Sequence, residues 1–240
     1  MDNYVIYPLC VGNALRKKDH TPGSTDPALE QGPIIVYYIE GRGHKILVDT
    51  GGTDPDWVRY MPYWRNEGET LPEKLASLGV SLEDIDTVIN THLHWDHCGG
   101  NGLFPNAEFW LQKREHDYWS DPANQNKPDN FDPKTAFAVE YNLIDGDCEI
   151  LPGISVILAT GHSPGMQCVL VDTDGGKHVI LGDLAVKCRH WENEPRFLPD
   201  DGYDSDTYKK FVEKADAVGG KILCGHDFKV FSRQKTYPEI

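Results

Sequence analysis

The stretch that decides the fold is Thr91-His92-Leu93-His94-Trp95-Asp96-His97-Cys98-Gly99-Gly100, which places three histidines and an aspartate within six residues. It follows residues 86–90, an apolar run that predicts a buried strand. Residues i and i+2 of an extended segment point to the same side, so His92 and His94 can hold one ion together. Asp96 and His97 come where the glycines predict a turn, which leaves them free to hold a second ion. Imidazole and carboxylate ligands without a thiolate suit zinc, iron, manganese or cobalt.

Three later residues repeat one pattern, in which an apolar strand is followed by a turn and a side chain able to bind metal. They are His162 in Thr160-Gly161-His162-Ser163-Pro164-Gly165, Asp183 after Val179-Ile180-Leu181-Gly182, and His226 after Ile222-Leu223-Cys224-Gly225. A single histidine after a strand is more often an ordinary loop residue, but loops at strand ends also carry chemistry. The repetition therefore predicts that these three residues complete a metal site with the histidine-rich stretch.

The rest of the chain shows strand and helix patterns in alternation. Apolar runs predict strands over residues 4–8, 34–40, 44–49, 107–112, 142–144, 154–159, 167–172, 178–182 and 221–224. Gly41-Arg42-Gly43 predicts a hairpin turn, and residues 120–133 read as a loop. Helical spacing covers residues 69–78, 113–119 and 205–218, with Ser205 as an expected N-cap. Strands with few helices and no linker predict a layered α/β fold in one domain over residues 1–240.

The composition is that of an acidic globular chain. Its 240 residues include 23 basic and 38 acidic side chains, for a formal net charge of −15. This charge repels nucleic acid and anionic membrane surfaces, and no apolar run is long enough for a membrane span. The first residues show no signal-peptide pattern, and the six cysteines form no Cys-x-x-Cys pair. We therefore expect a cytoplasmic protein with reduced thiols.

Together these motifs resemble those of the metallo-β-lactamase-fold hydrolases, and within them of the N-acyl homoserine lactonase branch. The matching stretches are Leu47-Val48-Asp49-Thr50-Gly51, His92-x-His94-x-Asp96-His97, Gln112-Lys113-Arg114-Glu115, Gly161-His162-Ser163-Pro164-Gly165, Gly182-Asp183, Gly225-His226-Asp227 and Tyr237-Pro238-Glu239. The likeness covers nearly the whole chain. The histidine motif is highly specific for the superfamily and moderately specific for the branch.

The resemblance implies an αββα sandwich of two mixed β-sheets flanked by helices, with a dinuclear site along one edge. It implies that the first metal ion is held by His92, His94 and His162, the second by Asp96, His97 and His226, and both by Asp183. Asp49 is implied to orient a ligand histidine. The implied cofactor is a pair of divalent ions, zinc before iron, manganese or cobalt, and the implied partner is a small molecule with an electrophilic carbonyl.

Two metal ions lower the pKa of a shared water and polarise a carbonyl, so the leading prediction is hydrolysis of a lactone or related cyclic ester. Asp96 is the predicted catalytic residue, taking up a proton after attack and passing it to the leaving group. Val186 departs from the lactonase pattern, which has a substrate-binding tyrosine there, and Met166 stands where a second histidine is common. A valine cannot donate a hydrogen bond. Lys187, His190 or a tyrosine are candidates to replace that donor, and a different lactone, ester or cyclic amide stays open.

Other functions fit the same scaffold. A thioesterase of the glyoxalase II type would bind glutathione through basic residues such as Lys229, Arg233 and Lys235. A zinc β-lactamase is disfavoured because it lacks a bridging aspartate and is normally exported. An iron-dependent oxidoreductase and a metal-stabilised scaffold protein remain open. One aromatic-rich stretch predicts either a lid or apolar wall over the site, or a packed helix or dimer contact. The dimer contact is the basis for expecting a homodimer. Its residues are Trp57, Tyr60, Met61, Tyr63 and Trp64.

Overall fold

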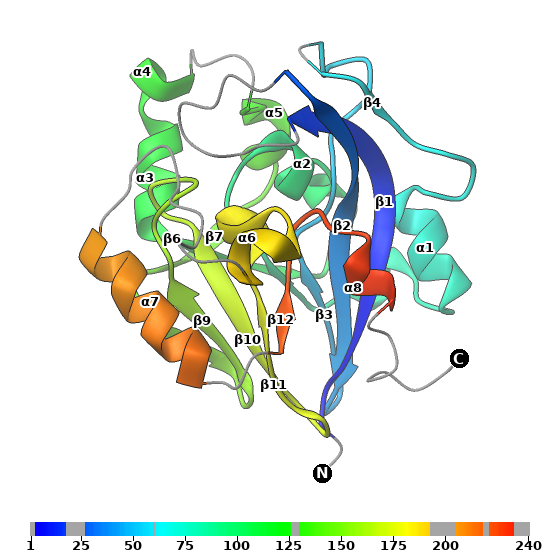
Figure 1. Cartoon of the computed structure of the whole chain (residues 1–240). Helices are drawn as coiled ribbons and strands as arrows, with labels where there is room; N and C mark the ends of the chain where they lie inside the picture. The colour runs from blue at the N-terminus through cyan, green and yellow to red at the C-terminus, as the bar shows by residue number, and fades with distance from the viewer. Residues whose placement is uncertain are drawn as a thin grey trace.

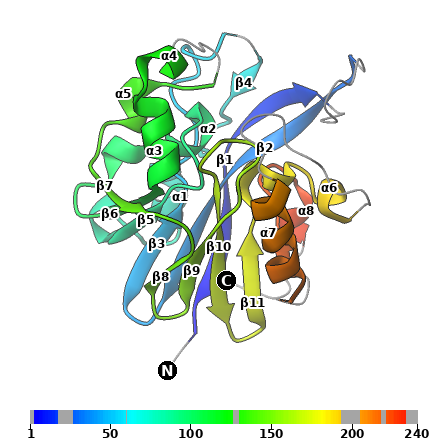
Figure 2. The ribbon, with the colours of Figure 1, turned by 90° about the vertical axis from the view of Figure 1, so that its left-hand side faces the viewer.

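The structure is a computed structural model that describes residues 3–17, 27–59, 61–125, 130–192, 205–217 and 221–232. Its strands form two sheets that face each other, with helices on the outer sides (Figures 1 and 2). One sheet has the order β4-β1-β2-β3-β5-β6-β7 and the other has the order β12-β11-β10-β9-β8. The predicted αββα sandwich is therefore confirmed.

The elements have the following bounds. The strands are β1 Val5–Lys17, β2 Leu29–Gly41, β3 His44–Val48, β4 Tyr63–Trp64, β5 Thr87–Ile89, β6 Glu108–Gln112, β7 Tyr141–Ile144, β8 Cys148–Leu151, β9 Ile154–Leu158, β10 Gln167–Thr173, β11 Gly176–Ile180 and β12 Ile222–Leu223. The helices are α1 Leu71–Ser77, α2 Trp95–Cys98, α3 Lys113–Ser120, α4 Pro122–Gln125, α5 Pro133–Ala136, α6 Cys188–Glu192, α7 Ser205–Ala217 and α8 Lys229–Ser232. Three short 3₁₀ turns are η1 Leu82–Asp84, η2 Asn101–Leu103 and η3 Gly182–Ala185.

The first sheet combines an antiparallel ribbon with a parallel half. β1 pairs with β2 and β2 with β3 in antiparallel register, and the predicted hairpin turn joins the latter two. Arg42 and Gly43 carry the turn with φ of 53° and 85°, the conformation that a two-residue hairpin needs. β3, β5, β6 and β7 are mutually parallel. Parallel strands end at a common edge, so the loops after them meet there.

The second sheet is antiparallel from β8 to β11 and closes with the parallel pair β11 and β12. β8 was not predicted from the sequence, because its apolar and polar residues alternate only weakly. β1 extends well beyond the predicted residues 4–8. The short helices α2, α4, α5, α6 and α8 were not predicted either, because a single turn of helix has too few residues to show a 3.6-residue period. The prediction of few helices is therefore wrong.

Two apolar layers hold the sheets in place. The largest core cluster lies between the sheets and includes Ile39, Val48, Val169 and Ile180. A second cluster lies on the outer side of the first sheet, where Leu71 and Leu75 of α1 pack. α7 covers the second sheet and α1 the first (Figure 2). None of the helices in the described part of the chain has both the length and the apolar composition needed to cross a bilayer.

Candidate metal centre

The candidate ligands lie at the ends of four strands from both sheets. His92 and His94 follow β5, His162 follows β9, Asp183 follows β11 and His226 follows β12. Asp96 and His97 are not in an irregular turn as expected, because residues 95–98 form the short helix α2. The structure brings all seven side chains together in two adjacent groups. Their roles as ligands stay a prediction.

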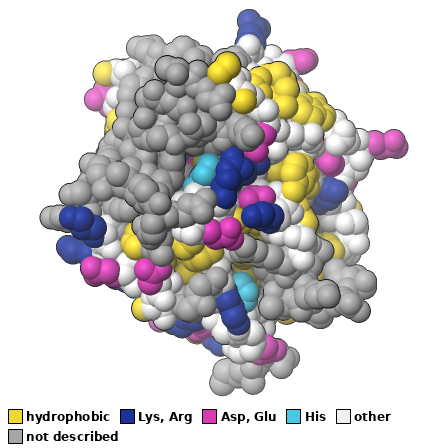
Figure 3. All heavy atoms as spheres, viewed as in Figure 1, with side chains coloured by type: hydrophobic (Ala, Val, Ile, Leu, Met, Phe, Trp, Pro, Cys, Tyr) yellow, Lys and Arg dark blue, Asp and Glu magenta, His cyan; other side chains and the backbone are white. Residues whose placement is uncertain are grey.

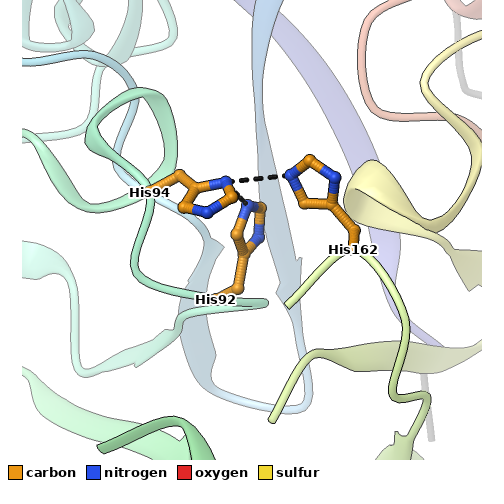
Figure 4. Close-up of side chains that lie close together, drawn as sticks. All are labelled: His92, His94 and His162. Atoms are coloured by element: carbon orange, nitrogen blue, oxygen red, sulfur yellow. Dashed lines mark hydrogen bonds between the residues drawn. The ribbon is translucent and has the colours of Figure 1, made fainter. Parts of the chain in front are cut away.

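The first group contains three histidines whose ring nitrogens converge (Figure 4). His94 Nδ1 lies 3.0 Å from His92 Nε2 and 2.9 Å from His162 Nε2. Ligand nitrogens around a tetrahedral zinc ion lie about 3.3 Å apart, given Zn–N bonds of about 2.0–2.1 Å. Both of these distances are therefore within a few tenths of an ångström of what one ion requires, and all three nitrogens lie within 4.8 Å of one another.

The second group contains Asp96, His97, Asp183 and His226, all buried. Asp183 Oδ1 lies 3.3 Å from His97 Nε2 and 2.8 Å from His226 Nε2. Its other oxygen, Oδ2, lies 3.3 Å from His162 Nε2 in the first group. One carboxylate therefore faces both groups, with a different oxygen toward each. That arrangement matches the bridging position implied for Asp183.

Hydrogen bonds on the outer ring nitrogens fix how three of the histidines point. His97 Nδ1 lies 2.7 Å from Asp49 Oδ2, which confirms the contact expected of Asp49. His226 Nδ1 lies 2.7 Å from the Pro33 carbonyl, and His92 Nδ1 lies 3.0 Å from Thr91 Oγ1. An outer partner of this kind sets the ring tautomer and leaves the inner nitrogen as an acceptor for a cation.

The electrostatics of the described site fit a pair of cations. His97 Nε2, His226 Nε2 and Asp183 Oδ1 are buried, and none makes a directed hydrogen bond with described residues. Burial lowers the pKa of His94 to about 3 and lowers the pKa of His162, so both rings are neutral, as metal ligands must be. Burial raises the pKa of Asp183, but His226, His97 and His162 outweigh it and hold that pKa well below its ordinary value. Burial lowers the pKa of His97, but Asp96, Asp183 and Asp49 outweigh it and raise that pKa well above its ordinary value, so a proton or a metal ion is favoured on this ring. Buried carboxylates that face imidazoles, and inward atoms without a directed hydrogen bond, together fit divalent metal ions.

Comparison with known proteins agrees with this geometry. The model of the metallo-beta-lactamase superfamily matches residues 29–226. The chain belongs to this superfamily. An N-acyl homoserine lactonase of a Bacillus species is 30% identical over 224 residues, covering 86% of each chain. The Bacillus cereus N-acyl homoserine lactonase is 29% identical over 223 residues, again covering 86% of each.

A solved structure shows the same architecture. An N-acyl homoserine lactone hydrolase, solved with the product N-hexanoyl-L-homoserine at its catalytic metal centre, superposes with a TM-score of 0.84. The likeness covers 100% of this chain and 99% of that one at 24% sequence identity. At this identity the superposition establishes the fold that the superfamily members share.

Glu115 holds together two of the loops that carry candidate ligands. It stands in a motif quoted above, but the sequence predicted no role for it. It is fully buried and accepts four hydrogen bonds with its two oxygens. Oε1 accepts from the Leu93 backbone at 3.1 Å and from Trp119 Nε1 at 2.8 Å. Oε2 accepts from Ser163 Oγ at 2.8 Å and the Gly165 backbone at 2.9 Å. Glu115 thus joins the loop of His92 and His94 to the loop of His162.

Arg16, at the end of β1, is a second residue that the sequence analysis missed. Its guanidinium forms an ion pair with Asp96 Oδ2 across 80 residues of sequence. Burial raises the pKa of Asp96, but Arg16 and two histidines hold that pKa below its ordinary value. Nothing local in the sequence around Arg16 indicates this contact, because it depends on the tertiary position of β1.

The residues weighed as replacements for the missing tyrosine lie beside this centre. Val186 is buried, and its carbonyl accepts from the His226 backbone at 2.8 Å. Lys187 is buried to 4% exposure, and its Nζ donates to the Gln31 carbonyl at 3.2 Å. His190 Nδ1 accepts from the Lys187 backbone nitrogen at 3.3 Å. Of these residues, only Lys187 offers a cationic donor head.

The described part of the aromatic-rich stretch packs into the protein, but as the strand β4 and not as the packed helix that was one of the expectations. Tyr63 lies in β4 and contacts Trp95 with ring centroids 4.8 Å apart. Trp57 and Met61 pack against the core cluster of the first sheet. Trp95 and Cys98 are buried in the metal loop. Lys229 pairs with Glu192 at 3.8 Å. Some residues named in the sequence analysis lie outside the described residues: Tyr60, Arg233, Lys235 and Tyr237-Pro238-Glu239.

Proposed function

We propose that this protein is a metal-dependent hydrolase that opens a lactone or a related cyclic ester. The observation that carries the proposal is the pair of buried ligand groups that share Asp183. Sequence relatives named N-acyl homoserine lactonase at 29–30% identity support the same reaction class.

When bound, two divalent cations at such a site polarise a carbonyl and make a water molecule nucleophilic at neutral pH. The protein supplies the remaining parts. Asp49, Thr91 and the Pro33 carbonyl orient the ligand rings, and the Glu115 carboxylate holds the two loops at a fixed distance. Asp96 Oδ2 lies 3.4 Å from His226 Nε2 and 3.7 Å from His97 Nε2 in the second group, where it can take up a proton and deliver it to the leaving oxygen.

We propose zinc as the metal in both groups. Five imidazoles and two carboxylates, with no thiolate among the two groups, are a ligand set that zinc binds well, and the first group has the near-tetrahedral spacing that zinc prefers. Elemental analysis of protein purified without added metal tests this: two equivalents of zinc per chain are expected. Two equivalents of iron or manganese instead would contradict the zinc proposal and leave the hydrolase proposal intact.

The experiment that tests the function is a substrate screen on metal-loaded protein. Lactones are expected to be hydrolysed, and His94→Ala is expected to lose the activity together with one equivalent of metal, because His94 contacts both other histidines of its group. His116→Ala is the matched control, since His116 is partly exposed on α3 and contacts Phe137 and Tyr141 instead of the ligands.

Three results would contradict the lactonase proposal. S-lactoylglutathione turned over in preference to every lactone would favour the thioesterase. Cyclic amides as the preferred substrates would favour an amide hydrolase. No turnover of any ester, lactone, thioester or amide by protein with two bound metal ions would favour a binding protein.

We also propose that the protein works in the cytoplasm with reduced thiols, and as a homodimer. Four of its six cysteines are buried: Cys98, Cys168, Cys188 and Cys224. Burial raises the pKa of the Cys98 and Cys168 thiols well above its ordinary value, so neither forms the reactive thiolate readily. Sedimentation equilibrium tests the homodimer, and a mass of one chain at micromolar concentration would contradict it.

A further inference from the structure

One face of the β1–β2 ribbon carries basic side chains beside the second ligand group. Arg16 lies opposite Glu30 in the antiparallel register, and Ala14 lies opposite Gly32. Side chains of opposite residues, and of residues two apart, point to the same face of a sheet. Arg16, Glu30 and the bare Gly32 therefore share one face, and this is the face on which His226 and Lys187 lie.

Gly32 makes room for the head of Lys187 next to the metal centre. A Cβ atom at Gly32 would lie 3.2 Å from Lys187 Nζ and 3.1 Å from the His226 carbonyl oxygen. Both distances are tighter than ordinary contact, so a side chain at position 32 would push the ammonium or the loop of His226 away from the strand by a few tenths of an ångström. Lys187 also directly follows Val186, the position that has lost the tyrosine donor of the lactonase branch.

Arg16 approaches the same centre from the other side. Its guanidinium contacts Asp96, and its side chain keeps 11% of its surface exposed. Burial lowers the pKa of Lys187, and the nearby charge of Arg16 lowers it further. Figure 3 shows Lys and Arg side chains grouped with acidic side chains and a histidine near the middle of one face of the molecule.

These cations stand out against the charge of the chain as a whole. The formal net charge is −15, a field that repels an anionic small molecule. Arg189 on α6 pairs with Glu30, and Glu30 also interacts electrostatically with Lys187. The one carboxylate is therefore shared between at least two cations. Burial lowers the pKa of Lys187, whereas Glu30 and Asp227 raise it, and the burial effect is the larger. These carboxylates therefore do not fully offset the loss of water around the ammonium group. An anion bound beside it would supply the missing compensation.

We propose that Arg16 and Lys187 select substrates in which the scissile lactone or ester carries a carboxylate group. The inference rests on the proposed function and names its substrate class. A planar guanidinium matches a carboxylate with two parallel hydrogen bonds, and a buried ammonium adds a point charge. A neutral acyl homoserine lactone makes use of neither cation.

The test uses two ligands with the same lactone ring, one anionic and one neutral, and lactone opening is followed separately from loss of the methyl group. The lactone 5-oxotetrahydrofuran-2-carboxylate and its methyl ester have the same ring, and the ester is neutral. Binding to the metal-loaded protein is measured by calorimetry at low temperature, and kcat and KM are measured in parallel. We expect the carboxylate to bind at least about tenfold more tightly than its ester, the effect of one charge-assisted contact of about 1.4 kcal/mol.

Variants assign the preference to the two cations. Lys187→Gln is expected to lose the preference for the carboxylate while ester binding and metal content are unchanged. Arg16→Gln is expected to lose the preference as well, and because Arg16 pairs with Asp96, its metal content and ester turnover are measured alongside. Arg189→Gln is the matched control, because it removes a neighbouring cation that pairs with Glu30, and it is expected to keep the preference.

Equal binding of the two ligands by the wild type, including no measurable binding of either at millimolar concentration, overturns the proposal. So does a preference that survives both Arg16→Gln and Lys187→Gln. Failure of the proposed function gives a different result, since protein that binds the carboxylate selectively yet hydrolyses no lactone, ester or thioester would keep the anion site and lose the hydrolase.

Discussion

Replacing Glu115 by glutamine should loosen the first ligand group without touching a ligand. The carboxylate accepts from two donors at each oxygen. A glutamine keeps one oxygen and presents an amide NH₂ in place of the other. If the NH₂ faced Leu93 and Trp119, it would oppose two groups that can only donate. It will therefore face Ser163, whose hydroxyl can rotate to accept, and Gly165, whose N–H cannot.

The magnitude follows from that count. Glu115→Gln leaves one buried N–H, that of Gly165, facing another donor, at a cost of about 1–3 kcal/mol in the free energy of unfolding. Glu115→Ala leaves four donors without this acceptor and should cost at least about 4 kcal/mol by the same rule. The loop cannot easily shift in compensation, because a Cβ at Gly165 would already lie 2.1 Å from the Glu115 nitrogen.

The same change should weaken metal binding selectively. Glu115 sets the distance between the loops of His92, His94 and His162, so we expect the first group to lose about 10–100-fold in metal affinity. The second group shares none of these hydrogen bonds and should bind as in the wild type. Urea unfolding of metal-free protein gives the stability, and titration with zinc in the presence of a competing chelator gives the two affinities.

Glu108→Gln is the matched control for this experiment. It makes the same chemical change on an exposed side chain of β6 and should alter neither quantity. If Glu115→Gln unfolds at the wild-type urea concentration and binds both zinc ions with wild-type affinity, the assigned positioning role of Glu115 is wrong. Weakening of both zinc sites to the same extent would also refute it, because it would indicate a general loss of structure.

Three further outcomes are expected. Asp49→Asn should weaken zinc binding at the second group by about 10–100-fold in the same titration, because the ring of His97 loses the carboxylate that orients it, and unchanged affinity would contradict this. Gly99→Ala should give little folded protein, since its Cβ would lie 2.1 Å from a backbone nitrogen of the facing loop, whereas Gly102→Ala, with its nearest atom at 3.6 Å, should fold normally by circular dichroism. Burial lowers the pKa of His178 in the folded protein below its value of about 6.5 in the unfolded chain. The neutral ring therefore contributes fully to the free energy of unfolding above about pH 6.5, and this contribution is lost as the pH falls. The wild type should therefore lose more unfolding free energy between pH 7.5 and 5.5 than His178→Gln does, and equal losses would refute this assignment.

The sequence alone determined much of the architecture and of the ligand set. Apolar runs marked most strands, and Gly41-Arg42-Gly43 marked the hairpin, because both patterns are properties of neighbouring residues. Four of the seven candidate ligands lie within residues 92–97, so their proximity needed no tertiary information. The other three could be added because each follows a strand, and strand ends meet at the edge of a sheet.

Only the tertiary structure decided which side chains surround that site. Asp96 meets Arg16 across 80 residues, and Glu115 reaches Gly165 across 50. The aromatic stretch turned inward to pack on Trp95. Such contacts depend on the register of β1 against β2 and on how the two sheets face each other. Local periodicity fixes which face of a strand is apolar, but it carries no information on which distant strand will lie against that face.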